Sequence, residues 1–326
     1  MNLKFAKVSA AALATVFGVV VASVAVAQDK YPSRPIEFIL PAPPGGGLDR
    51  TMRLLAEFAE PILGQKILFT YKPGGNGTIG TSLIAQAKPD GYTIGAVWHS
   101  PLTTAPHTLQ VPYTLDDFIP VVQFSAGPYV ICVAPDFPAN TGQELIAELK
   151  ANPQKYIYGH DGVGGTVHLA SERTLKPLGV QLRGVPFNGS GETARAFLGG
   201  HIAVYSGSVP PIGPHMAAGK AKCLIIHSKQ RNPMLPQAAS LTDLGVPDSE
   251  TLLWHAIIAP KGVPPDRIAV VERAFREAAS QTKYLEFLRG NGETAPLKTG
   301  ADLAKIWNDE SVAMGTLVQT MGIKKQ

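Results

Sequence analysis

The residues of this chain best suited to binding chemistry lie in its glycine-rich loops. The chain has 33 glycines among 326 residues, and several of them cluster at 43–47, 72–77 and 160–165. Each cluster follows a β-type run and precedes a helical pattern. Such a loop presents unpaired backbone N–H groups at a helix N-terminus, where the macrodipole favours an anion. For the loop at 159–166 alone, a tight turn with positive φ angles is a simpler interpretation. Several such loops together predict an anion site, because ligands of open sheets bind beyond the carboxyl ends of strands.

Catalytic signatures are missing. Ser190 follows Asn188 and Gly189, so it lacks the glycine two positions earlier that a nucleophile elbow needs. The string Ser-x-x-Lys at 280–283 has no partner motif, and no phosphate-binding P-loop, HExxH or EF-hand string occurs. The eight histidines are spread too widely to indicate a metal site. We therefore predict no catalytic residue, metal or cofactor. An exported hydrolase using Ser190 or Ser206, with His160 or His168 as base, stays the alternative.

Short β-type runs alternate with helical patterns along most of the chain, which is typical of parallel α/β sheets. The predicted strands are 36–40, 67–71, 92–98, 129–134, 156–159, 182–187, 202–205, 223–227 and 254–259. The predicted helices cover 48–62, 78–87, a segment opened by a capping box at 141–144, a segment from 166, a segment ending at 198, 265–279, 284–289 and 301–321.

The order of these elements predicts an α/β protein with two domains and no flexible linker. Short crossovers near 125–128 and 250–253 suit a double hinge between ordered strands. Domain 1 would comprise residues 28–126 and 253–326, and domain 2 residues 127–252, both of normal domain size.

The first residues resemble a secretory signal peptide. Lys4 and Lys7 precede an uncharged run that ends in Ala25-Val26-Ala27, a small-x-small cleavage pattern. We expect cleavage near Ala27, export to the periplasm and no membrane insertion afterwards. A net charge of +4 without a basic stripe argues against nucleic-acid binding. Cys132 and Cys223 could pair in an oxidising compartment or stay as two buried thiols.

A set of motifs resembles the Bug-type family, the extracytoplasmic solute receptors of tripartite tricarboxylate transporters. The matching strings are YPSRPI at 31–36, PPGGGLD at 43–49, PGGNGTIG at 73–80, PDGYT at 89–93, GGTVHL at 164–169, VPFNGSG at 185–191, LGGHI at 198–202 and APKGVP at 259–264. They cover nearly the whole chain after residue 30. The resemblance implies a periplasmic binding protein of the Venus-flytrap type, expected to be a monomer, whose cleft closes on a small organic carboxylate. A two-component membrane permease would be its partner, or a sensor if the protein only signals.

The resemblance also implies which residues form the site. One wall would be made by Pro43, Gly45, Gly46, Asp49, Thr78, His99, Ser100 and Pro101. The opposite wall would be made by His160, Gly164, Gly165, Thr166, His168, Asn188 and a turn formed by Ser206, Gly207 and Ser208. His168 is equally compatible with a packing role.

The ligand class follows from departures from the family pattern. Gly47 and Leu48 stand where the family commonly has Ser or Thr, and Gly207 stands where it commonly has an acidic residue. The missing acid would remove a partner for an amino group and enlarge the pocket. We therefore expect a mono- or dicarboxylate with an apolar body, of which an aromatic ring is one form, rather than an amino acid.

Overall fold

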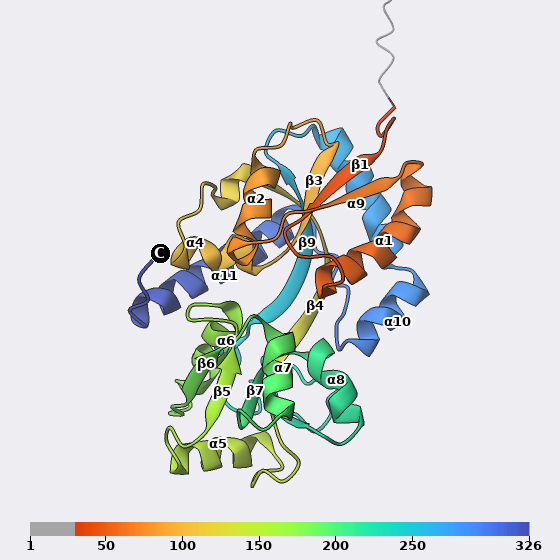
Figure 1. The fold of residues 1–326 in the computed structure, drawn as a ribbon. Helices are drawn as coiled ribbons and strands as arrows, with labels where there is room; N and C mark the ends of the chain where they lie inside the picture. The colour runs from red at the N-terminus through yellow and green to blue at the C-terminus, as the bar shows by residue number, and fades with distance from the viewer. Residues whose placement is uncertain (1–29, 326) are drawn as a thin grey trace, which may run out of the picture. The chain divides into compact units, whose positions relative to one another are not determined.

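A nine-stranded mixed sheet organises residues 30–325, which are the residues that the computed structural model describes (Figure 1). The predicted signal peptide lies outside them. The strand order is β2-β1-β3-β9-β4-β7-β5-β6, and β8 pairs with β4. The strands are β1 (Ile36–Leu40), β2 (Ile67–Tyr71), β3 (Thr93–Trp98), β4 (Phe118–Val133), β5 (Ile157–His160), β6 (Arg183–Pro186), β7 (Val204–Ser208), β8 (Lys222–Ile226) and β9 (Leu252–Pro260).

Helices cover both faces of this sheet. They are α1 (Gly47–Leu63), α2 (Thr78–Ala85), α3 (Ser100–Thr103), α4 (Ala105–Thr108), α5 (Gly142–Ala151), α6 (Thr166–Leu175), α7 (Ser190–Leu198), α8 (Val209–Ala217), α9 (Pro265–Ala279), α10 (Thr282–Gly290) and α11 (Gly300–Thr320). In the described part of the chain, no helix combines the length and apolar character that crossing a bilayer requires.

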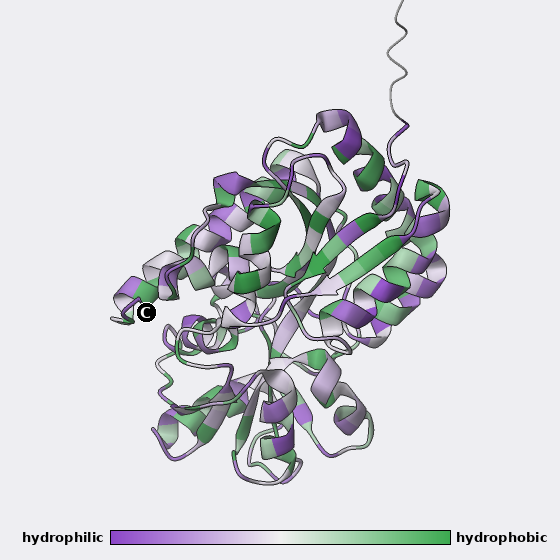
Figure 2. Cartoon of the chain, turned by 45° about the horizontal axis from the view of Figure 1, so that its top comes forward, coloured by the Kyte–Doolittle hydropathy of each residue, from purple (hydrophilic) through white to green (hydrophobic). Residues whose placement is uncertain are grey.

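Alternating burial along the strands decides which helices cover which face. In β1, Phe38 and Leu40 belong to a core shared with α1 and α9, whereas Ile39 points into a core shared with α2 and α11. The other half of the sheet repeats this logic. Val130 of β4 packs with α7 and α8, and Ile131 packs with α5. Figure 2 shows the resulting pattern, with apolar strands inside and polar residues on the outward sides of the helices.

β4 and β9 form an antiparallel ribbon that runs through the middle of the sheet (Figure 1). They pair from Phe118 opposite Pro260 to Pro128 opposite Leu252. From Tyr129 onward β4 pairs with β7 and β8 instead. Both expected crossovers therefore lie in or beside ordered strands, as the absence of a linker suggested. The division into two domains at 126–127 and 252–253 stays a prediction.

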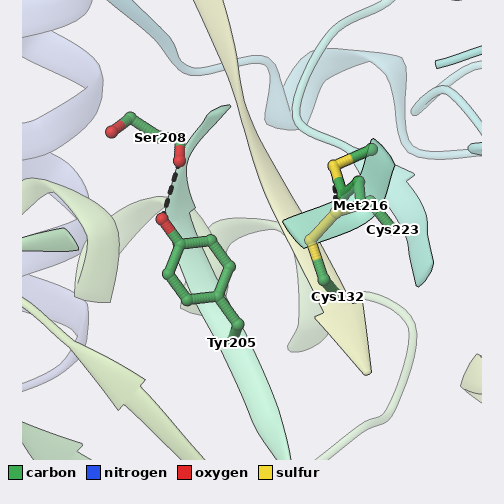
Figure 3. The surroundings of a disulfide bond; sticks show 5 residues. All are labelled: Cys132, Tyr205, Ser208, Met216 and Cys223. Atoms are coloured by element: carbon green, nitrogen blue, oxygen red, sulfur yellow. Dashed lines mark hydrogen bonds between the residues drawn. A yellow bond between two sulfur atoms is a disulfide. The ribbon is translucent and has the colours of Figure 1, made fainter. Parts of the chain in front are cut away.

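A disulfide joins Cys132 of β4 to Cys223 of β8, which answers the question that the sequence left open. The two residues are cross-strand partners, and both side chains are buried. Figure 3 shows Met216 of α8 beside the bond and Tyr205 on the neighbouring strand β7. The Tyr205 hydroxyl donates a hydrogen bond to the Ser208 carbonyl at 2.6 Å.

Two local predictions fail where tertiary packing overrides local signals. Ser206, Gly207 and Ser208 were expected to form a turn, but they belong to strand β7, which pairs with the buried end of β4. Helix α8 was not predicted because it contains Pro210, Pro211 and Pro214. The first two prolines lie near its N-terminus, where a missing N–H removes no helical hydrogen bond.

Candidate functional site

A cavity of about 540 Å³ gathers loops from both halves of the sheet. Its lining combines the turn before α2, the end of β3, helix α4, the β5–α6 and β6–α7 loops and the segment after α11. The lining residues are Asn76, Trp98, Thr108, Leu109, Asp161, Val163, Gly164, Gly165, Phe187, Asn188, Gly189, Ile323 and Lys324. The position agrees with the rule that open α/β sheets bind ligands beyond the carboxyl ends of their strands.

The Gly-rich turn before α2 is held against the end of β3. Asn76 adopts positive φ (51°), and its Nδ2 donates to Ser100 Oγ at 2.9 Å. Gly77 also has positive φ (85°), and a Cβ there would lie 2.6 Å from Pro101 Cγ and 2.5 Å from the Trp98 ring. Only glycine fits this close approach. The turn therefore holds Asn76 and Trp98 in fixed positions on the cavity wall.

The β5–α6 loop uses most of its own donors. The Gly162 amide donates to His160 Nδ1 at 3.1 Å, and the Gly164 amide donates to His168 Nδ1 at 3.2 Å. The two imidazole rings pack with centroids 4.5 Å apart. His160 and His168 thus shape the loop from behind, and neither lines the cavity.

Asp161 occupies the N-terminus of α6. Its carboxylate accepts the amides of Val167 at 3.0 Å and His168 at 3.2 Å. Burial raises the pKa of Asp161, while these amides lower it, and the net direction is upward. This helix end therefore already holds a side-chain acid, so the anion expected at the 159–166 loop is supplied by the chain itself.

The first turn of α1 differs, because its donors are open. Asp49 is buried, and its carboxylate accepts the Gly45 amide at 2.7 Å, the Tyr71 hydroxyl at 2.7 Å and Arg53 Nε at 2.9 Å. Burial would raise the pKa of Asp49, but these hydrogen bonds outweigh it and hold the pKa below its usual range. The amides of Gly47, Leu48 and Asp49 have no acceptor among residues 30–325. They form an unused donor set at a helix N-terminus.

The predicted site residues fall into three groups. Gly164, Gly165 and Asn188 line the cavity. A second group lies beside or behind its walls and comprises Thr78, Ser100, Pro101, His160, Thr166 and His168. The third group is not among the lining residues of this cavity and comprises Pro43, Gly45, Gly46, Asp49, His99, Ser206, Gly207 and Ser208.

His99 belongs to a buried network rather than to the cavity wall. Its Nδ1 lies 2.7 Å from Glu310 Oε1, and its Nε2 lies 3.0 Å from the Tyr129 hydroxyl. Glu310 also accepts Trp254 Nε1 at 2.6 Å. His99 thereby connects α11 to β4 and β9 of the central ribbon, which is a structural role.

The expected enlargement of the pocket at Gly207 is wrong. A Cβ on Gly207 would lie 2.6 Å from Tyr205 Cζ and 2.8 Å from Ser190 Oγ. The aromatic ring and the serine already fill the space that an acidic side chain would need. Glycine at this position leaves room for the ring of Tyr205, which lies on the same strand, and for Ser190, and it opens no room for a ligand.

The serines of the hydrolase alternative have structural partners. Ser206 Oγ lies 2.8 Å from Ser171 Oγ and is buried, and Ser190 Oγ accepts the Ser208 amide at 3.1 Å. Across residues 30–325 no histidine hydrogen-bonds either serine, and no group of three or more metal-ligating side chains occurs. The nucleophile and base that acyl transfer needs are not assembled.

Several lining residues escaped the sequence analysis. Asn76, Asp161 and Phe187 lie inside or next to motifs that had been singled out, and Trp98 directly precedes His99. Because they lie so close to these motifs, the sequence could have indicated that they belong to the site. Thr108, Ile323 and Lys324 carry no local signal, because only the packing of α4 and α11 brings them to the cavity.

Acidification from about pH 6.5 to about pH 4 is expected to destabilise the fold through His168. Burial, followed by the charge of His160, lowers the pKa of His168 from 6.5 to about 4. Between pH 6.5 and pH 4 the His168 imidazole binds a proton in the unfolded chain but stays neutral in the folded chain. The contribution of neutral His168 to the free energy of unfolding is therefore fully present above pH 6.5 and is lost as the pH falls toward 4. His227, whose pKa is also about 4 because of burial, acts in the same window.

The His168→Asn variant measures this contribution. The unsubstituted protein should lose more unfolding free energy between pH 7 and pH 4 than this variant does. We expect a difference of about 1 kcal/mol, which allows for partial solvent screening of His168, and urea titrations at the two pH values measure it. His201→Asn, at an exposed position, is the control. An unchanged pH slope in the His168 variant would contradict the assignment.

Comparisons with known proteins concern the whole chain and its fold. The model of the TctC family, described as the tripartite tricarboxylate transporter family receptor, matches residues 51–323. Protein BugT of Bordetella pertussis is 30% identical over 319 residues, which are 96% of this chain and 98% of BugT. A solved structure described as a periplasmic transporter is similar with a TM-score of 0.80 and 32% identity, covering 90% of this chain and 99% of its own.

A further solved structure, a Rhodopseudomonas palustris protein with adipate, is similar with a TM-score of 0.79. It is 24% identical and covers 91% of this chain and 100% of its own, so the likeness is one of fold alone. The predicted α/β periplasmic binding protein fold is confirmed.

Proposed function

Since this chain belongs to the tripartite tricarboxylate transporter receptor family, we propose that it captures a small carboxylate with an apolar body for uptake. Its family consists of periplasmic solute receptors, and the chain is a binding protein rather than an enzyme. The predicted family membership is thus confirmed, and the ligand is the open question.

The composition of the cavity supports the proposed ligand class. Trp98, Leu109, Val163, Phe187 and Ile323 contribute apolar surface. Val163 is 69% exposed at the tip of its loop, so an apolar ligand group could cover it.

The polar groups of the cavity suit an acid. Asn76 and Asn188 bring amide side chains, and Asn188 lies directly before the N-terminal end of α7. Among residues 30–325, Asp161 is the one acidic side chain that lines the cavity, and its carboxylate is hydrogen-bonded to amides of α6. A ligand ammonium would find no free carboxylate, which favours an acid without an amino group. Adipate, held by the Rhodopseudomonas palustris protein of the same fold, has this chemistry.

The cavity of about 540 Å³ with apolar walls and amide donors is the observation that carries this proposal. Binding would shift the population toward a conformation in which both walls touch the ligand. Export to the periplasm after loss of residues 1–27, and delivery to a two-component membrane permease, complete the proposed role. A receptor that reports occupancy to a sensor would use the same cavity.

Calorimetric titration with adipate, terephthalate, citrate, glutamate and aspartate tests the ligand class. We expect adipate or terephthalate to bind more tightly than either amino acid, by at least about tenfold, or ~1.4 kcal/mol. Tighter binding of glutamate or aspartate would contradict the proposed class. Failure of all five acids to bind would contradict the proposed function.

A further inference from the structure

The segment that follows α11, Gly322–Lys325, contributes to the cavity. We call it the α11 tail. We infer that Lys324 of this tail recognises a second acidic group of the ligand, so that the site selects dicarboxylates over monocarboxylates. This inference rests on the proposed function and specifies its substrate class.

Hydrogen bonds fix the α11 tail at the end of its helix. The Gly322 amide donates to the Gln319 carbonyl at 3.0 Å, and the Ile323 amide donates to the Val318 carbonyl at 3.1 Å. Two successive donors bonded back to the last helical turn set the direction of the residues that follow. Lys324 therefore leaves the helix from a defined position.

Apolar contacts place the tail against the opposite side of the cavity. Ile323 packs on a small core formed by Leu169 of α6 with Met314 and Val318 of α11. Its Cγ2 also lies 3.5 Å from the point where a Cβ on Gly164 would stand. The tail thus meets the β5–α6 loop through Ile323. Lys324 lines the same cavity as Gly164 and Gly165.

The charges around the cavity leave Lys324 available for a ligand. Among the lining residues only Asp161 and Lys324 carry side chains that are charged at neutral pH. Asp161 accepts the α6 amides, and within residues 30–325 Lys324 takes part in no ion pair. The one acidic side chain among the lining residues, Asp161, is held by backbone amides. The Lys324 ammonium can therefore attract a ligand carboxylate, and this attraction strengthens as the site loses water.

The neighbouring lysine provides a matched control. Lys325 is exposed, as Lys324 is, but it does not line the cavity. Its charge instead helps, after burial, to lower the pKa of His107. Substituting either lysine removes the same charge from the same short segment, so any difference between the two variants reports position rather than net charge.

The test compares Lys324→Gln with Lys325→Gln by calorimetry at low and physiological salt, with adipate and hexanoate as probes. Lys324→Gln should weaken adipate binding roughly three- to tenfold, the range between an exposed and a desolvated ion pair. The same variant should change hexanoate binding by less than about twofold, since hexanoate has no second carboxylate. Lys325→Gln should leave both affinities near those of the unsubstituted protein, and Lys324→Arg should keep most of the adipate affinity.

Melting temperatures of the variants confirm that each is folded. Equal effects of the two glutamine variants, or an equal loss for adipate and hexanoate, would overturn the role of Lys324 while leaving the proposed function intact. If the unsubstituted protein binds no organic acid, the proposed function and this inference both fail.

Discussion

Replacing Cys132 and Cys223 together with alanine is expected to lower the free energy of unfolding by about 4 kcal/mol. The disulfide joins residues 91 positions apart, and a loop of this length restricts the unfolded chain strongly, by about 4–5 kcal/mol in the chain-entropy model. The buried side chains also lose some packing. Urea unfolding followed by circular dichroism at pH 7 measures the difference.

The unsubstituted protein with a thiol reductant is the matched control for this variant. It keeps the sulfur atoms and loses only the bond, so it should approach the stability of the double variant. A double variant as stable as the oxidised protein would show that the bond does not form or adds nothing to stability.

Gly165→Ala is expected to reduce ligand affinity at least tenfold. Gly165 has an ordinary backbone conformation (φ −70°), so alanine causes no strain of its own. Its Cβ would, however, meet the Asp161 carboxylate, 2.7 Å from Cγ, and the Asp161 carbonyl at 2.8 Å. The carboxylate that caps α6 would be displaced, and the lining loop would move with it. We expect a stability loss of about 1–3 kcal/mol from this overpacking.

Gly191→Ala provides the comparison, because a Cβ at Gly191 meets no atom within 4 Å. Gly191 lies in the first turn of α7, next to the β6–α7 loop that also lines the cavity. Calorimetry with the acid that binds best should show near-normal affinity for this variant and a clear loss for the Gly165 variant. Unchanged affinity in the Gly165 variant would contradict the idea that the Asp161 cap positions the cavity wall.

Local sequence predicted those elements that have glycine or proline near at least one end. The strands at 36–40 and 67–71 and the helix at 265–279 agree with the structure residue for residue. The first part of β4 could not be found in this way. Pro120, Gly127 and Pro128 read as breaks, but β-bulges near 120–125 accommodate the first of them, and pairing with β9 stabilises the whole run.

The site was predictable only in outline. The loops carrying Gly164, Gly165 and Asn188 could be chosen because they follow strands and contain glycine. Which amides remain open could not be foreseen, because that depends on side chains such as His168 and Asp49 folding back onto their own loops. Lys324 lies 160 residues after Gly164 in the chain and reaches the cavity through tertiary packing alone.

The pairing of β4 with β9 limits how the two halves of the molecule can move. Each bond of the antiparallel ladder ties one strand to the other, so sliding would break many bonds at once. Bending and twisting of the ribbon keep these bonds and change only their angles slightly. If the cavity opens and closes as proposed, its walls would therefore move by bending and twisting of this ribbon, and not by sliding of β4 along β9.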